Sequence, residues 1–282
     1  MIIDIHVHLG SIRSFYSLIR GWVTVYIEDL LGYMDEVGVQ KAVVLSVPRR
    51  DDPDSRVVSN EELLRTVQEY EDRLIPFCVL DPRENNLGDR LSRLVKLGCR
   101  GIGEFKVRLP ADDDSVVKFL KMVSDYGLPV LFHMEEGEYF YDVFRLRKVL
   151  EKFPDMAFIG HGPGWWRHIS KQPPSKESYP KGPITEEGMI QKLLREYENI
   201  YADISAYSGL NALARDPEYS KKFLSEFQDR VLFGTDFPCL SITGSQFGVN
   251  REHLNFLHKL GISSEILERI LHLNAEKILF RK

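Results

Sequence analysis

Two histidines near the start of the chain are the first residues that could do chemistry. They lie in IIDIHVHLG, residues 2–10, which is apolar enough to predict a buried strand. Alternate residues of a strand point to the same side, so His6 and His8 project together, and Asp4 is predicted on their face. Two imidazoles aimed at one point suit a metal ion, because neutral imidazole is a common zinc ligand. The alternative is a buried strand whose histidines are satisfied within the core.

Further along the chain, side chains that can ligate a metal or transfer a proton recur at the ends of predicted strands. They are Glu104, His133, His161, Asp203 and Asp236. An unpaired charged or polar group is costly to bury, so chance does not readily place these residue types at the ends of apolar segments. The pattern favours one polar site assembled from separated segments.

The elements that must position these residues alternate regularly between apolar segments of strand length and amphipathic helical segments. Eight strands are predicted, at residues 2–10, 41–47, 74–80, 100–105, 128–134, 156–161, 199–204 and 231–236. Helices are predicted at residues 28–37, 60–70, 87–97, 115–126, 141–153, 185–197, 220–227, 251–260 and 264–280. Eight βα units predict an α/β fold of the TIM (β/α)8 barrel type, in which functional groups lie at the C-terminal ends of the strands. An open doubly wound sheet is the alternative, but that fold would require a glycine-rich phosphate-binding turn after the first strand.

Composition narrows the function classes. The 282 residues carry a net charge of −5 with a pI near 5.9, which gives no basic surface for nucleic acid and no polybasic membrane patch. No apolar segment approaches the ~18 residues of a membrane span. No internal linker is evident, so we expect a single domain over residues 1–282. Cys78, Cys99 and Cys239 form no CxxC pair, and with no basic leader at the N-terminus we expect a reduced, cytoplasmic protein.

Five motifs together resemble the amidohydrolase superfamily. They are DIHVH, LFH, IGHGPG, FGTDFP and the closing LHLNAEKILF, and they span the whole chain. The chain is most similar to the amidohydrolase-related branch, which includes aminocarboxymuconate semialdehyde decarboxylase. The resemblance implies that four residues bind a divalent metal ion: His6, His8, His133 and Asp236. It also implies that Asp236 acts as general base, and that His161 polarises the substrate or orients the attacking water.

The number and identity of the metal ions stay open. Zinc is the default for histidine and aspartate ligands, while manganese, iron, nickel and cobalt fit the same donors. Glu104 occupies the position at which binuclear members carry a bridging group, so it either bridges a second ion or pairs with Lys106 or Arg108. Those two cations also suit a carboxylate on the substrate. Asp4 and Asp203 are expected to support the ligands from behind, because metal-bound imidazoles usually donate their second N–H to an oxygen.

Two connecting segments are predicted to shape the pocket, and a third to cover it. Residues 11–26 form a long loop that we expect to cover the site, with simple packing as the alternative. Residues 162–183 form another, and long loops in compact proteins are often functional. From this loop, and from the predicted loop 205–216, candidate substrate contacts are Trp165, Trp166, Arg167, Tyr207, Asn211 and Arg215. For the tryptophans, packing against the barrel rim is an equally good interpretation.

The predicted function is hydrolysis of a small amide, lactone or ester by a metal-activated water. The alternative is non-oxidative decarboxylation of a small unsaturated or aromatic carboxylic acid by the same residues. A third hypothesis, from another class, is a barrel that has lost catalysis and serves as a binding protein. The expected partner is a small-molecule substrate that could carry a carboxylate. The sequence neither predicts nor excludes assembly into a homo-oligomer.

Overall fold

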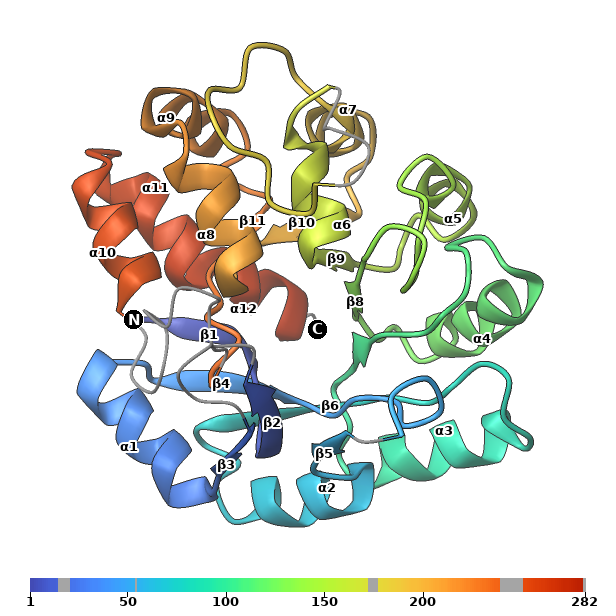
Figure 1. Cartoon of the computed structure of the whole chain (residues 1–282). Helices are drawn as coiled ribbons and strands as arrows, with labels where there is room; N and C mark the ends of the chain where they lie inside the picture. Colours follow the sequence, from blue (N-terminus) through green and yellow to red (C-terminus); the bar gives the residue numbers. More distant parts are fainter. Residues whose placement is uncertain (15–20, 54, 172–176, 239–250, 281–282) are drawn as a thin grey trace.

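Eight parallel strands form the central sheet of the computed structural model, which describes residues 1–14, 21–53, 55–171, 177–238 and 251–280. The strands follow one another around a barrel in chain order (Figure 1). They are β1 (Ile3–Val7), β4 (Lys41–Leu45), β6 (Leu74–Cys78), β7 (Gly101–Phe105), β8 (Val130–His133), β9 (Phe158–His161), β10 (Ile200–Asp203) and β11 (Val231–Leu232). The predicted TIM-barrel fold is confirmed.

Backbone hydrogen bonds join the segment after β11 to β1. Ile5 N donates to Phe233 O at 3.1 Å, and His8 N donates to Phe237 O at 2.8 Å. Between them, Asp236 N donates to His6 O at 2.7 Å. The regular part of β11 ends at Leu232 and is shorter than predicted, yet these bonds close the seam between the first and last strands.

Helices surround the barrel because each has one apolar face that packs on the strands. They are α1 (Ile27–Val37), α2 (Asn60–Gln68), α3 (Leu87–Lys96), α4 (Asp114–Ser124), α5 (Leu146–Lys152), α7 (Met189–Glu196), α9 (Pro217–Glu226), α10 (Glu252–Lys259), α11 (Ser264–Glu268) and α12 (Asn274–Leu279). Local signals set their ends. The Ser59 hydroxyl accepts from Glu62 N at the start of α2, and Gly38 ends α1 with a φ of 80°.

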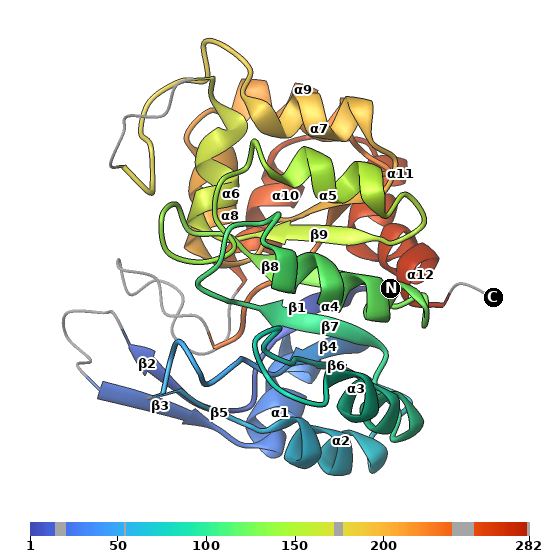
Figure 2. The ribbon, with the colours of Figure 1, turned by 90° about the vertical axis from the view of Figure 1, so that its right-hand side faces the viewer.

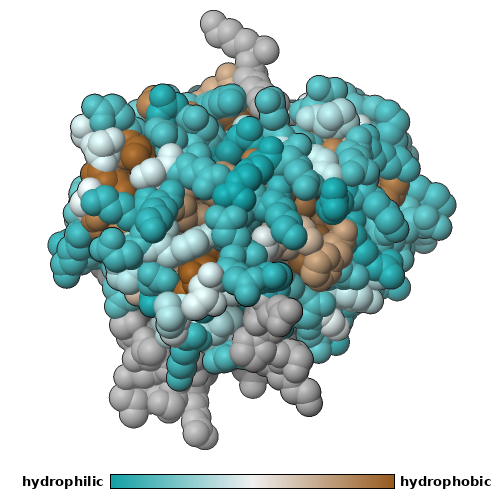
Figure 3. Space-filling view, turned by 90° about the horizontal axis from the view of Figure 1, so that it is seen from above, coloured by the Kyte–Doolittle hydropathy of each residue, from teal (hydrophilic) through white to brown (hydrophobic). Residues whose placement is uncertain are grey.

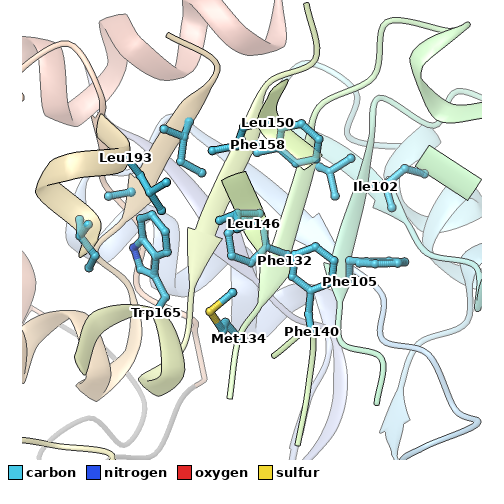
Figure 4. Close-up of a cluster of buried hydrophobic side chains, with 14 of the residues drawn as sticks. Ile102, Phe105, Phe132, Met134, Phe140, Leu146, Leu150, Phe158, Trp165 and Leu193 are labelled. Atoms are coloured by element: carbon cyan, nitrogen blue, oxygen red, sulfur yellow. The ribbon is translucent and has the colours of Figure 1, made fainter. Parts of the chain in front are cut away.

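Two layers of apolar side chains hold the barrel together. The inner layer fills the barrel and includes Ile5, Leu45, Phe77, Ile159 and Leu232. The outer layer lies between strands and helices, where Figure 4 shows Phe132, Phe158, Trp165 and Leu193 among its members. Both faces of each strand are thus covered, which explains the nearly continuous apolar segments of the sequence.

Three expected loops contain regular structure, and the first is the predicted cover. Part of the predicted cover, residues 11–26, forms an antiparallel hairpin of β2 (Gly10–Ser14) and β3 (Gly21–Val25), while residues 15–20 lie outside the described part. β5 (Arg56–Val57) adds a third strand, and Figure 2 shows this sheet extending beyond the barrel. The expectation of a loop was wrong because residues 10–14 and 21–25 pair in register, so that their backbone groups bond each other.

The other loop corrections lie after β9 and β10. Residues 163–166 form the short helix α6 (Pro163–Trp166), followed by a 3-10 turn at Arg167–Ile169. Residues 206–214 form α8 (Ala206–Ala214), which had been predicted as loop. Its AYSGLNALA sequence holds five strong helix formers, three alanines and two leucines, and it begins just after Ser205, an N-cap residue.

Of the residues that the structure describes, no helix is long and apolar enough to span a bilayer. Figure 3 shows one face of the molecule, on which hydrophobic residues form small separate areas within a hydrophilic surface.

Candidate metal centre

Seven of the predicted site residues lie at or just after the C-terminal ends of barrel strands. His6 and His8 come from β1, Glu104 from β7, and His133, His161, Asp203 and Asp236 from β8, β9, β10 and the segment after β11. The strands converge here, so residues up to 230 positions apart lie within hydrogen-bond range of one another. The site is therefore built by the barrel and not by one local motif.

His6 and His8 face each other across the centre. The pairing of β1 with β4 shifts register between Asp4 and Val7, and such irregularities re-aim side chains. The Nε2 atoms of the two rings lie 3.1 Å apart. Asp236 Oδ1 lies 3.5 Å from His6 Nε2 and 3.2 Å from His8 Nε2.

Hydrogen bonds behind these rings assign their tautomers. His8 Nδ1 lies 3.0 Å from Leu45 O, which can only accept, so Nδ1 carries the hydrogen. His6 Nδ1 lies 2.8 Å from the Asp203 carboxylate and donates in the same way. In the neutral form, each ring then presents a bare Nε2 lone pair to the other. Two lone pairs and a carboxylate oxygen around one point form a donor set that a divalent cation satisfies.

A second group of donors adjoins the first. His133 Nδ1 donates to Glu104 Oε1 at 2.5 Å, and Glu104 Oε2 lies 3.5 Å from His8 Nε2. His161 Nε2 lies 4.0 Å from Glu104 Oε1 and 4.0 Å from Asp236 Oδ2. His133 Nε2 is buried and has no hydrogen-bond partner in the described chain, although Glu135 Oε2 is 3.8 Å away. Glu104 thus lies between His8 and His133, where it can contribute to either group.

Among the described residues, three overlapping sets of donors lie close enough to hold one ion. They are His6, His161 and Asp236; His6, His8 and Glu104; and Glu104, His133 and His161. The buried Nε2 of His133, which has no hydrogen bond to a described residue, and the opposed lone pairs of His6 and His8 both fit a bound cation. The residues present therefore suit the metal that the sequence predicts.

Mutual pairing sets the charge of the acidic residues. Burial alone would raise the pKa of Glu104, but the His133 ring holds it well below the usual value. Burial would also raise the pKa of Asp236, but its interactions with His6 and His8 outweigh burial, so the pKa is lowered. For Asp203 hydrogen bonds from His161 and His6 outweigh burial and lower the pKa strongly. All three residues are carboxylates at neutral pH, which suits them to a cation.

Asp4 lies apart from the ring nitrogens. Its carboxylate accepts hydrogen bonds from Tyr33 Oη at 2.9 Å and from Thr235 Oγ1 at 2.6 Å, as well as from the backbone N–H groups of His6 and Thr235. Burial raises the pKa of Asp4 to about 6 despite these bonds. Asp4 therefore supports the backbone of β1, while Asp203 supports the His6 ring.

The two predicted cations lie beside the His133 end of the centre. Lys106 is partly buried, with its Nζ 4.8 Å from the centre of the Tyr139 ring, and it takes part in no ion pair among the described residues. Burial lowers the pKa of Lys106, but Glu104 outweighs it and the pKa is raised, so the ammonium stays charged. Arg108 is exposed, contacts the same ring at 5.3 Å and pairs with Glu138 at 3.5 Å.

The tryptophans predicted as pocket residues lie in the core. Trp165 is fully buried and packs edge-on against Phe132, with ring centres 5.8 Å apart. Trp166 Nε1 donates to Asp203 O at 2.7 Å, and Arg167 is also buried. The structure does not bring the tryptophans together with the histidines. The Trp165 ring fills space between strands and helices (Figure 4), and the Trp166 ring packs against Phe223, with ring centres 6.2 Å apart.

The candidates from α8 contact a neighbouring loop. Tyr207, Asn211 and Arg215 recur every four residues and lie on one face of the helix. Tyr207 contacts the Tyr179 ring at 5.3 Å, Asn211 Nδ2 donates to Pro180 O at 3.1 Å, and Arg215 Nη1 donates to Gly182 O at 3.2 Å. These side chains hold residues 179–182 against the helix.

The sequence interpretation missed one residue of the centre. Ser205 Oγ lies 2.9 Å from His161 Nδ1 and donates to Asp203 Oδ2 at 2.6 Å. Its only signal is its position two residues after Asp203, where a strand would place both side chains on one face. Serine is too common after strands for that spacing to stand out.

Comparison with known proteins gives a consistent result. A family model described as "Amidohydrolase" matches residues 3–281. No curated protein matches the chain. Among solved structures, a probable 2-pyrone-4,6-dicarboxylic acid hydrolase from Acinetobacter baumannii, with citric acid bound, is similar at 16% identity and a TM-score of 0.68, covering 99% of both chains.

Two decarboxylases are also similar in structure. The 2,6-dihydroxybenzoate decarboxylase from Rhizobium shares 15% identity at a TM-score of 0.61, covering 99% of this chain and 98% of that one. A dihydroxybenzoic acid decarboxylase from Polaromonas, with bound manganese and 2-nitroresorcinol, shares 17% identity at a TM-score of 0.57, covering 91% and 86%. At these identities the likeness establishes a shared fold.

Proposed function

This chain belongs to the amidohydrolase family, and from that premise we propose that it is a metal-dependent hydrolase of a small amide, lactone or ester that carries a carboxylate. The observation that carries the proposal is the opposed pair of Nε2 atoms on His6 and His8, 3.1 Å apart, with Asp236 Oδ1 beside both. Neutral imidazoles in this arrangement repel each other unless a cation lies between them.

The proposed ligands are His6, His8 and Asp236, with His133 offering its unpartnered Nε2 and Glu104 between the two groups. A bound divalent ion supplies Lewis-acid activation of a water molecule and of the substrate oxygen. Zinc is the first choice for this set of nitrogen and carboxylate donors, and manganese, iron, nickel and cobalt fit it too.

Asp236 is proposed as the general base. Its side chain is 19% exposed, more than any histidine of the centre, so it meets both the ligands and an incoming substrate. As a carboxylate it can accept a proton from the attacking water and return it to the leaving group. His161, whose Nε2 lies 4.0 Å from Asp236 Oδ2, can accept a hydrogen bond from the attacking water and orient it.

Lys106 is proposed to bind the substrate carboxylate. It is a charged ammonium beside His133 that has no ion-pair partner in the described chain. A carboxylate substrate would supply that partner, which orients the scissile bond toward Asp236.

Decarboxylation is the second candidate, favoured by the two proton acceptors that face the centre, His161 and Asp236, 4.0 Å apart. When the bond to the carboxylate breaks, CO2 leaves and its electron pair stays on the substrate carbon. That carbon then needs a proton, which Asp236 or His161 can take from a water molecule and pass on to it. The similar fold of two decarboxylases agrees with this candidate without selecting it.

The test begins with elemental analysis of the purified protein before any chelator is added. We expect about one divalent ion per chain, and about two would indicate that Glu104 bridges a second. The protein is then assayed with carboxylate-bearing lactones, esters and amides, and in parallel with hydroxybenzoates while CO2 is measured. Acid release without CO2 supports hydrolysis, whereas CO2 release establishes decarboxylation. Failure to hold or take up zinc or manganese would overturn the proposal and favour a binding protein.

A further inference from the structure

The hydroxyl of Ser205 lies directly behind the centre, between two of its imidazoles. Ser205 follows β10 and is fully buried. Its Oγ lies 2.9 Å from His161 Nδ1 and 3.2 Å from His6 Nδ1. It also donates to Asp203 Oδ2 at 2.6 Å, and that same oxygen lies 2.8 Å from His6 Nδ1 and 3.1 Å from His161 Nδ1.

These contacts decide where the ring hydrogens lie. A serine hydroxyl has one hydrogen, and the short contact to the Asp203 carboxylate takes it. Its lone pairs can then only accept, so each Nδ1 that faces Ser205 must bring a hydrogen of its own. Both rings are thereby held with Nε2 bare and directed at the centre.

A purely structural role does not account for this hydroxyl. Ser205 is the N-cap residue of α8, yet its side chain makes no capping hydrogen bond to the helix. Its backbone N–H, not its hydroxyl, donates to Asp203 Oδ1 at 2.8 Å. The hydroxyl is committed to the carboxylate and the two imidazoles.

We propose that Ser205 is a positioning residue that works with Asp203 to hold His6 and His161 in the tautomer that presents Nε2 to the metal and the substrate. Its effect on metal binding rests on the proposed function, whereas the tautomers are a property of the protein without metal. When the Ser205 hydroxyl is removed, Asp203 Oδ2, 3.1 Å away, is the one acceptor of this group that remains for His161 Nδ1. The His161 ring then also adopts the form that carries its hydrogen on Nε2, which no longer accepts from the centre.

The chain offers a matched control in Ser208, three residues along. Its Oγ is buried as well but has no hydrogen-bond partner in the described chain. Ser208→Ala therefore removes the same atom from the same helix without touching the imidazoles. His8 serves as an internal reference, because Leu45 O holds its Nδ1 hydrogen in every variant.

The experiment records 15N–1H correlation spectra of the histidine side chains in metal-free wild type, Ser205→Ala and Ser208→Ala. We expect Nδ1–H signals for His6 and His161 in the wild type and in Ser208→Ala. In Ser205→Ala we expect Nε2–H signals of His161 to appear while His8 is unchanged. Asp203→Asn, which removes the shared carboxylate, should shift both His6 and His161. Ser205→Cys, with a weaker thiol donor, gives the same comparison if the alanine variant does not fold.

Zinc affinity supplies the second readout. Loss of a group that supports a ligand from behind typically weakens metal binding by about 10- to 100-fold, and for Ser205→Ala we expect about 10-fold. Unchanged tautomers and unchanged affinity in Ser205→Ala would overturn the proposal. A wild-type protein that binds no zinc would refute the proposed function, while the spectra would still decide the role of Ser205.

Discussion

At the scale of single residues, hydrogen bonds to the imidazole rings orient the donors of the centre toward one point. Three imidazoles have an acceptor on Nδ1: Leu45 O for His8, Asp203 for His6 and Glu104 for His133. Each acceptor fixes the ring orientation and leaves Nε2 as the free lone pair. Binding a metal therefore requires little reorganisation of the side chains.

Asp236→Asn tests the proposed base. The amide keeps the shape of the side chain but cannot accept a proton, so we expect kcat to fall by about 10²- to 10⁴-fold. Steady-state kinetics on a substrate found by screening measures the effect, and circular dichroism checks the fold. Full activity in this variant would exclude the base role.

Lys106→Met tests the carboxylate contact. Losing one charged hydrogen bond costs about 1.5–3 kcal/mol, so KM for an anionic substrate should rise by about 10- to 100-fold. Arg108→Met is the matched control, because Arg108 lies two residues away but is exposed and already paired with Glu138. Equal effects of the two substitutions would argue against a specific role for Lys106.

The residue types and their positions in the sequence predicted which side chains meet at the metal centre better than they predicted the substrate contacts. The histidines and acids at strand ends meet because a closed barrel brings those ends together. This constraint applies as soon as the eight strands are recognised in the sequence. No such constraint tells whether Trp165 or Asn211 turns toward the centre or away from it. Packing against Phe132 directs Trp165, and the hydrogen bond to Pro180 directs Asn211. Both contacts depend on the tertiary structure.

At the scale of elements, one arginine links the loops that follow three strands. Arg83, after β6, pairs with Asp81 at 2.5 Å and also with Asp51, in the loop after β4. Asp51 in turn accepts from the backbone N–H of Arg108, after β7, at 2.7 Å. Burial would raise the pKa of Asp51, but the Arg83 guanidinium outweighs it and the pKa is lowered. Arg83 therefore keeps three neighbouring loops in register at the mouth of the barrel.

Arg83→Met should destabilise the protein by about 1–3 kcal/mol. The substitution leaves the largely buried carboxylates of Asp81 and Asp51 without their cation, and buried charges that lose their partner are costly. Thermal unfolding measures the change. Arg90→Met is the control, because its pair with Glu84 is more exposed and should contribute little. Equal melting temperatures for the two variants would contradict the role of Arg83.

The packing of α10 predicts a pH dependence. His253 is buried, its Nε2 donates to Ala206 O at 2.9 Å, and burial lowers its pKa from 6.5 to about 4. Below pH 6.5 the unfolded chain takes up a proton that the folded protein refuses, so stability falls as pH drops toward 4. The loss in the free energy of unfolding approaches about 3 kcal/mol.

Denaturant unfolding between pH 7 and pH 4 checks this expectation. His253→Gln cannot titrate in this range and should show a flatter stability profile than the wild type. His258→Gln, an exposed position of the same helix, is the control and should follow the wild-type profile. Parallel profiles for His253→Gln and wild type would rule out His253 as the source.

The order of elements was predictable, whereas their boundaries and the structure inside the loops were less so. Apolar segments separated by amphipathic helices indicate a parallel barrel because both faces of each strand are covered. The hairpin of β2 and β3 escaped prediction because its stability comes from cross-strand pairing, which a sequence reveals only when the register is known. Helix α8 escaped because AYSGLNALA mixes helix formers with turn residues.

At the scale of the whole molecule, the proposed ligands connect the first strand, the middle strands and the last one. An ion held by residues of β1, β8 and the segment after β11 stabilises the folded barrel, since the unfolded chain cannot bring these residues together. The metal is thus expected to contribute to stability as well as to chemistry.

Zinc should therefore raise the melting temperature of chelator-treated protein. At a thousand times the dissociation constant the gain is about 4 kcal/mol, or roughly 8 °C for a chain of this size. Differential scanning fluorimetry measures the shift. The double variant His6→Ala with His8→Ala should show none, and a full shift in that variant would place the zinc elsewhere.

The seam between β1 and the last segment has a consequence for how the chain is made. Phe233, Asp236 and Phe237, which bond this strand, are synthesised some 230 residues after His6 and His8. At about 5–20 residues per second, this leaves an apolar strand with one open edge for roughly 10 to 50 s. During that interval the open edge of β1 needs protection of the kind that a chaperone gives.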